Sequence, residues 1–234
     1  MLTGLKQEIL RQLRSTIPRA EKNQRSYLDM FTGIVQSCVS VVRVTKKSGL
    51  TSFALRFSKD MVRGLKRGAS VAVDGACLTV TSINNDLVSF DAMAETLRKT
   101  TLGAIKVGTW VNIERSAKLG DEIGGHIVSG HVSGMAKIVR VQKSANNLVL
   151  TFQVPREFMK YIFPKGFIAL DGASLTIVDV DQQRATCTIY LIPETLRLTT
   201  FGLKKVGDLV NVEIDSRTQT IVDTVNSLMR ARLR

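Results

Sequence analysis

Hydrophobic and polar residues alternate in short runs along most of the chain, from residue 30 to about residue 215. Cys38–Val44 and Ser52–Phe57, for example, are rich in β-branched and apolar residues and are separated by the turn signal Lys47-Ser48-Gly49. Six such runs succeed one another at intervals of about ten residues before residue 116, a spacing that is typical of a barrel or sandwich of short strands. The pattern therefore predicts an all-β fold.

The strand pattern is duplicated. Asp74-Gly75-Ala76-Cys77-Leu78-Thr79-Val80 recurs 97 residues later as Asp171-Gly172-Ala173-Ser174-Leu175-Thr176-Ile177. Further segments match in the same order: Thr32–Val35 with Ser129–Val132, Glu95–Thr101 with Glu194–Thr200, and Lys106–Glu114 with Lys205–Glu213. A period this long is unlike that of a solenoid and indicates a duplicated domain. We predict two tandem domains, residues 30–125 and 126–217.

The two ends of the chain lie outside the duplication. In residues 1–29, Leu2, Leu5, Ile9 and Leu13 recur at helical spacing, which predicts a basic amphipathic extension. The alternative is a dispensable segment ahead of a second start at Met30.

Residues 218–234 also read as a helix. Ile221, Val225, Leu228 and Met229 form one apolar stripe along it. The stripe can pack on its own domain or join subunits, and its place outside the duplicated plan favours assembly between subunits.

Composition narrows the function classes. The chain has 44% hydrophobic and 23% charged residues, and it lacks an apolar run of membrane-spanning length, so we expect a soluble protein without a membrane partner. Three scattered cysteines and two histidines support neither a disulfide framework nor a metal site, which favours the reducing cytoplasm. The net charge of +13 attracts polyanions, but the basic residues are scattered and aromatic residues are few, so we expect no nucleic-acid partner.

A few side chains can carry chemistry. Cys77 is the only cysteine in the repeated segment, and Ser174 takes its place in the second copy. Cys77 is either a small buried hydrophobe or a reactive group near a barrel mouth. His126 and His131 lie five residues apart. Each either suits proton transfer or is an ordinary core or surface histidine. Hydroxyl residues that could hold a polyol stand at largely matching places in the two copies: Ser70, Thr79, Thr96, Ser174, Thr176 and Thr195.

These residues resemble a known family. The resemblance rests on Met30–Val35, the Cys77 segment, Gly124-Gly125-His126, Ser129-Gly130-His131, Lys165-Gly166-Phe167 and Leu191–Thr195. Together they resemble the trimeric riboflavin synthase family, whose members contain tandem lumazine-binding repeats, over residues 30 to about 230. The resemblance implies two six-stranded Greek-key barrels and a C-terminal helix that joins three subunits. It also implies a transferase that needs no cofactor and converts two molecules of 6,7-dimethyl-8-ribityllumazine to riboflavin and 5-amino-6-ribitylamino-uracil.

The resemblance also implies site residues. The candidate catalytic residues are Ser70, Cys77, His126, His131 and Asp215. The first pocket would use Gly33, Ile34, Val35, Cys77, Leu78, Thr79, Asp91, Ala92, Met93, Ala94, Glu95 and Thr96. The second would use Gly130, His131, Val132, Lys165, Ser174, Leu175, Thr176, Tyr190, Leu191, Ile192, Pro193, Glu194 and Thr195. Related antenna proteins bind a single lumazine or flavin without reaction, and they are the alternative.

Overall fold

The computed structural model describes residues 30–143 and 147–232, so the helix predicted within residues 1–29 lies outside the described residues. The first domain contains β1 (Ser37–Lys47), β2 (Leu50–Arg56), α2 (Lys59–Val62), β3 (Ser70–Val73), β4 (Ala76–Asn84), β5 (Leu87–Met93), α3 (Ala94–Lys99), η1 (Thr101–Ala104) and β6 (Trp110–Arg115). The second contains β7 (Gly134–Lys143), β8 (Leu148–Gln153), η2 (Arg156–Tyr161), β9 (Phe167–Leu170), β10 (Ala173–Thr176), β11 (Asp179–Asp181), β12 (Thr186–Leu191), α4 (Pro193–Leu198), η3 (Thr200–Leu203) and β13 (Leu209–Ile214). The chain ends in α5 (Ser216–Arg232).

The first domain is a closed barrel of six antiparallel strands in the order β1-β2-β5-β4-β3-β6. Alternation along the strands directs one set of side chains inward, as in β4, where Ala76, Leu78 and Val80 are buried. Phe53 and Phe90 fill the interior with their rings 5.8 Å apart. The all-β prediction and the six-stranded barrel are confirmed here.

The second domain repeats this order as an open half-barrel. Its sheet runs β10-β9-β13-β7-β8-β12-β11, because the counterpart of β4 is divided into β10 and β11. The first domain has a bulge at the matching place, between Val80 and Ser82, and a bulge locally interrupts the ladder. Around the break, the Val178 amide still donates to the Thr188 carbonyl at 2.9 Å. The predicted fold class is confirmed, with the difference that the second sheet has seven strands and does not close.

The repeated Asp-Gly pairs meet at the contact between the two domains. Asp74 and Gly75, with φ of 45° and 78°, turn the chain from β3 into β4, and Asp171 and Gly172 do the same between β9 and β10. Two successive positive φ values are what a two-residue type I′ hairpin requires, and Asp-Gly suits them. The turns lie back to back: a Cβ on Gly75 would come within 2.6 Å of the Gly172 nitrogen. The duplicated segment thus joins the domains at its turn.

Two asparagines lock these turns together. Asn112 Nδ2 donates to the Asp171 carbonyl at 2.9 Å, and Asn211 Nδ2 donates to the Asp74 carbonyl at 2.7 Å. Each asparagine belongs to one domain and reaches the turn of the other. Buried polar groups are costly unless paired, so this reciprocal pairing makes the domain interface specific.

The aspartates of the two turns are buried, and a lysine reaches one of them. Lys204 Nζ lies 2.8 Å from Asp171 Oδ2, whereas Ile105 stands at the matching place in the first domain. Burial, together with the neighbouring Asp171 carboxylate, raises the pKa of Asp74 well above its usual range. The two buried turns therefore differ in charge, because a lysine pairs with Asp171 and an isoleucine stands at the matching position of the first domain.

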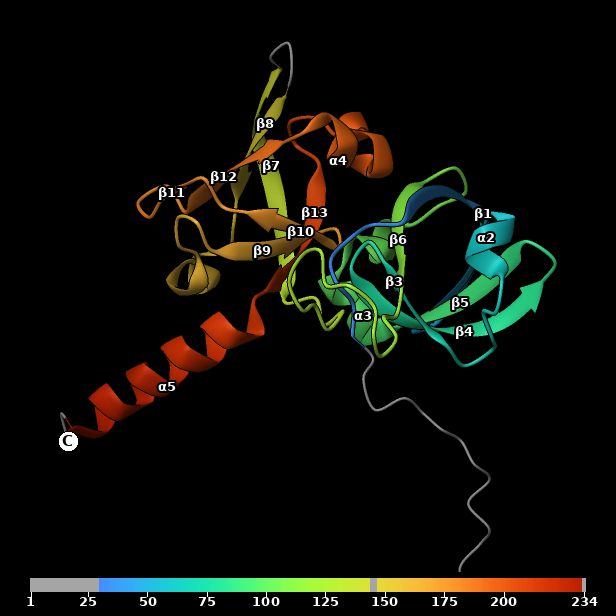
Figure 1. Cartoon of the computed structure of the whole chain (residues 1–234), viewed down its shortest axis with the longest axis horizontal. Coiled ribbons are helices and arrows are strands. Elements are labelled where there is room, and N and C mark those ends of the chain that lie inside the picture. The colour runs from blue at the N-terminus through green and yellow to red at the C-terminus, as the bar shows by residue number, and fades with distance from the viewer. Residues whose placement is uncertain (1–29, 144–146, 233–234) are drawn as a thin grey trace, which may run out of the picture.

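Helix α5 projects away from both domains (Figure 1). Tyr161 Oη and Lys160 Nζ, both from η2, donate to Asp223 Oδ1 at 2.8 Å and fasten the helix to the second domain. The predicted apolar stripe is exposed in the single chain, with Ile221 at 64% and Leu228 at 63%. The helix is confirmed, and its own domain leaves the stripe uncovered. Within the described residues, no helix is both long and apolar enough to cross a membrane.

Candidate functional site

The candidate residues of the repeated segment lie on the outer wall of each domain. In β4, Leu78 is buried while Cys77 is half-buried and Thr79 is exposed. Ser174 and Thr176 in β10 face outward in the same way around buried Leu175. Since side chains alternate along a strand, the hydroxyl and thiol groups are on the outer face of the sheet and not at a barrel mouth. Leu78 and Leu175 belong to the cores and can offer only backbone atoms.

The segments before β1 and β7 cross to the opposite domain. The Gly33 carbonyl accepts a 2.8 Å hydrogen bond from the Ser174 amide, and the Gly130 carbonyl accepts one of 2.9 Å from the Cys77 amide. The approaches leave no room for a side chain, because a Cβ on Gly33 or Gly130 would lie 2.5 Å from the Cβ of Ser174 or Cys77. The predicted grouping of Gly33 with Cys77 was therefore wrong: the structure places Gly33 with Ser174 and Gly130 with Cys77.

Side-chain packing also shows that the segments before β1 and β7 cross to the opposite domain. Val35 belongs to the hydrophobic core of the second domain, and Val132 packs against the core of the first. The crossing begins at an antiparallel bridge between Phe31 and Val128, both of which are buried. A local pattern does not report such pairing, because the bridged residues are far apart in sequence.

His126 lies beside Ser174, in the half of the site that Ser174 forms with Gly33 (the Ser174 half). Its Nδ1 is 2.6 Å from Ser174 Oγ, and its ring stacks on Phe167 with centroids 5.2 Å apart. Burial lowers the pKa of His126, partly offset by the nearby charge of Asp215. The imidazole is therefore neutral near pH 7 and able to accept a proton. His131 follows Gly130 in the Cys77 half and is exposed, so the two histidines belong to different halves.

Asp215 has a structural task of its own. Its Oδ1 accepts hydrogen bonds from Thr218 N at 2.7 Å and Thr218 Oγ1 at 2.6 Å, so it caps the N-terminus of α5. The cap also places its charge near His126. The structure thus joins the start of the terminal helix to the Ser174 half of the site.

Strand register explains the difference between the two walls. Ser70 of β3 pairs with Thr79 of β4, and Phe167 of β9 pairs with Thr176 of β10. Directly paired residues lie on the same face of a sheet. At this position the Cys77 wall carries the hydroxyl group of Ser70, which is buried. The Ser174 wall carries the aromatic ring of Phe167 at the matching position.

The remaining candidates flank these walls. Where β5 passes into α3, Asp91, Met93 and Ala94 are exposed and Ala92 is buried. Where β12 passes into α4, Tyr190, Ile192 and Pro193 are exposed and Leu191 is buried. Thr96 and Thr195 are half-buried, and Lys165 and Ile34 are exposed. Glu95 and Glu194 pair with Arg98 and Arg197 on the same short helices. Both sets leave apolar side chains in solvent, with Met93 at 63% and Ile192 at 61% exposed.

Sequence reasoning missed two buried glutamates. Glu114 is 4% exposed and Glu213 is 8% exposed, on β6 and β13. Glu114 accepts hydrogen bonds from the Thr32 and Gly33 amides, and Glu213 accepts them from the Ser129 and Gly130 amides. A glutamate at the matching position of both copies, directly after an apolar residue of a predicted strand, was the signal that could have found them.

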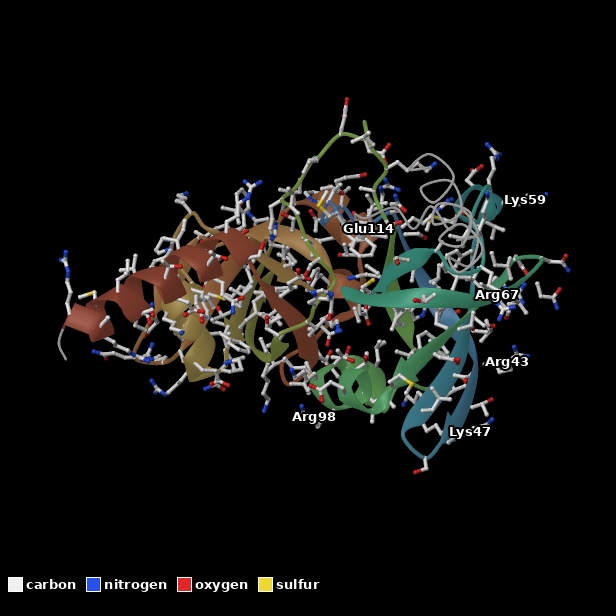
Figure 2. All side chains as sticks on the ribbon, turned by 90° about the horizontal axis from the view of Figure 1, so that it is seen from below. Arg43, Lys47, Lys59, Arg67, Arg98 and Glu114 are labelled. Carbon is white, nitrogen blue, oxygen red and sulfur yellow. The ribbon has the colours of Figure 1, made fainter. Side chains whose placement is uncertain are left out.

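The excess positive charge is partly remote from this site. Figure 2 shows Glu114 on the side of the first domain that faces the second, while four labelled basic side chains lie at the opposite end: Arg43, Lys47, Lys59 and Arg67. Among the described residues, no group of three or more His, Cys, Asp or Glu side chains could hold a metal ion.

The chain is similar to known proteins. The family model described as the lumazine binding domain matches residues 32–116 and again 129–215. The chain is 50% identical over 204 residues to a riboflavin synthase of Escherichia coli strain K12, which covers 87% of this chain and 95% of that protein. It is 44% identical over 200 residues to a riboflavin synthase of Chlamydia pneumoniae, covering 86% and 97%.

Two solved structures share the fold. LumP complexed with riboflavin superimposes with a TM-score of 0.75 at 25% identity, over 80% of this chain and 100% of that one. LumP complexed with 6,7-dimethyl-8-(1'-D-ribityl) lumazine gives a TM-score of 0.72 at 25% identity, over 80% and 99%.

Proposed function

The chain belongs to the riboflavin synthase family, and we propose that it transfers a four-carbon unit between two molecules of 6,7-dimethyl-8-ribityllumazine. The products are riboflavin and 5-amino-6-ribitylamino-uracil, which together contain all the atoms of the two substrates. The observation that carries this proposal is the pair of matched outer walls, one with Cys77 and the other with Ser174. Two similar walls can bind the same molecule twice, while their differences assign the two copies different tasks.

The two walls suit opposite halves of the chemistry. The lumazine ring is electron-poor, so its C7 methyl group can lose a proton to a neutral base, and His126 beside Ser174 has that character. Cys77 and Ser70, on the same face of β4 and β3, can add to the other lumazine, directly or through a water molecule. Most of the acceleration would come from holding two reactants at high effective concentration. No resident cofactor enters this scheme.

A complete site requires a second copy of the chain. The exposed apolar residues beside the walls and along α5 would be covered in an assembly, and α5 begins at the cap that adjoins His126. We propose a cytoplasmic homotrimer in which the Cys77 wall of one subunit faces the Ser174 wall of its neighbour. A sedimentation mass of three chains would agree with this arrangement, and a stable active monomer would contradict it.

Incubation with the lumazine tests the activity. The purified protein should produce riboflavin, followed by its visible absorbance, from the lumazine as sole substrate. LumP is the structural neighbour that favours the alternative, a binding protein without turnover. Tight binding of the lumazine with no riboflavin formed would establish that alternative and overturn the proposed synthase activity.

A further inference from the structure

Glu114 and Glu213 make the same contacts with two different segments. Glu114 Oε1 accepts from Thr32 N at 2.6 Å and from Thr32 Oγ1 at 2.8 Å, and its Oε2 accepts from Gly33 N at 3.1 Å. Glu213 receives the equivalent bonds from Ser129 N, Ser129 Oγ and Gly130 N at 2.7, 2.7 and 3.0 Å. A carboxylate is an acceptor with two oxygens, so each one satisfies three donors without needing a donor of its own.

The held segments form part of the opposite pocket. Gly33 lies against Ser174, and a Cβ on Gly125, next to His126, would collide with the Thr32 carbonyl. Gly130, held by Glu213, lies in the same way against Cys77. Glu114 belongs to the first domain, yet it fixes a wall of the Ser174 pocket in the second. The converse holds for Glu213 and the Cys77 pocket.

We propose that Glu114 and Glu213 are positioning residues that act crosswise, each setting the geometry of the pocket whose thiol or hydroxyl belongs to the other domain. The proposal rests on the proposed function, because it assigns these walls to the substrate. It adds that each pocket depends on a carboxylate from the opposite domain. The two glutamates therefore have separable effects, since the pockets carry different side chains.

Glutamine at these positions is an informative change. The side chain keeps its size, and its carbonyl oxygen can still accept from Thr32, but its NH2 group faces the Gly33 amide, which is also a donor. Gly33 then has to move away from the glutamine and, because it already touches Ser174, the wall moves with it. A displacement well under 1 Å is enough to affect a reaction that depends on alignment, so we expect kcat to fall about 10- to 100-fold.

The two histidines are one reporter for each pocket. They are the whole histidine content of the chain, so selective ¹³C labelling of histidine gives ring signals from only two residues. We expect Glu114→Gln to shift the His126 signals and leave those of His131 in place. Glu213→Gln should do the reverse, and it should also change the alkylation rate of Cys77 by iodoacetamide without changing that of Cys38.

The experiment uses the full chain and compares both variants with Asp86→Asn, which removes one charge at the exposed β4–β5 turn and should keep wild-type spectra and turnover. If a glutamine variant does not fold, Thr32→Val removes the hydroxyl bond to Glu114 and should shift the His126 signals more weakly. Ser129→Ala removes the hydroxyl bond to Glu213 but also the bond from the His131 amide to Ser129 Oγ, so its effect is read from the alkylation rate of Cys77. A shift of His131 in place of His126 for Glu114→Gln, a shift of His126 in place of His131 for Glu213→Gln, equal shifts at both histidines, unchanged spectra, or unchanged turnover in an active enzyme would each overturn the inference. Crosswise shifts in a protein that makes no riboflavin would leave the positioning role standing and reject the proposed function.

Discussion

Substituting alanine for Gly75 should loosen the contact between the two domains. Gly75 has a φ of +78°, and a Cβ at this position would lie 2.6 Å from the Gly172 nitrogen and 3.0 Å from the Gly172 Cα. An ordinary contact needs about 3.5 Å or more between such atoms, so the two turns must separate by close to an ångström. That movement stretches both interdomain hydrogen bonds of Asn112 and Asn211.

The magnitude follows from these two effects. Placing alanine in the left-handed region costs about 1 kcal/mol. Losing two buried hydrogen bonds adds about 1 kcal/mol each, and more if the amide donors stay unpaired. We therefore expect Gly75→Ala to lower the free energy of unfolding by about 3–5 kcal/mol, a large share of the 5–15 kcal/mol typical of a native protein. Gly172→Ala, whose Cβ would lie 2.9 Å from the Gly75 nitrogen, should cost nearly as much.

Gly108→Ala is the matched control. Gly108 also has a positive φ, +84°, but a Cβ there would meet no atom within 4 Å, so only the backbone penalty of about 1 kcal/mol applies. Guanidinium unfolding followed by circular dichroism, at one protein concentration for all variants, measures the difference. Equal losses for Gly75→Ala and Gly108→Ala would refute the back-to-back packing of the turns as a source of stability.

Three other predictions concern catalysis, charge and assembly. Cys77→Ser should lower kcat about 100-fold or more while changing lumazine affinity little; equal losses in both would reduce Cys77 to pocket lining. The pKa of Asp74 is raised by burial, so its stabilising contribution is present at acidic pH and is lost as pH rises through that raised pKa. Asp74→Asn should therefore make the free energy of unfolding decline less steeply with pH above about pH 4. Asp171→Asn leaves the Lys204 ammonium group without its carboxylate partner and should lower the free energy of unfolding by about 3 kcal/mol at pH 7. Truncation after Thr218 should yield monomers with little activity in sedimentation and riboflavin assays, and a truncated trimer would place the contact elsewhere.

The sequence predicted the local structure well, because local structure follows from short-range pattern. Alternation and turn residues indicated short strands, and the Asp-Gly pairs are where tight hairpins form. Internal duplication indicated two domains with one topology, and the apolar stripe in residues 218–234 predicted α5. The family followed from ordered motifs. The interruption between β10 and β11 was not predicted, since it depends on how the strands pair across the sheet.

The strands, their duplication and the residue types available to each wall follow from the order of residues along the chain. Folding in three dimensions sets which residues meet: Gly33 with Ser174, Gly130 with Cys77, and each buried glutamate with the wall of the opposite pocket. These contacts join residues that are far apart along the chain, such as Gly33 and Glu114, which are separated by 81 positions. Periodicity reports the neighbours of a residue within its own strand or helix, whereas the crossing of two segments between domains depends on packing and hydrogen bonds that no local pattern contains.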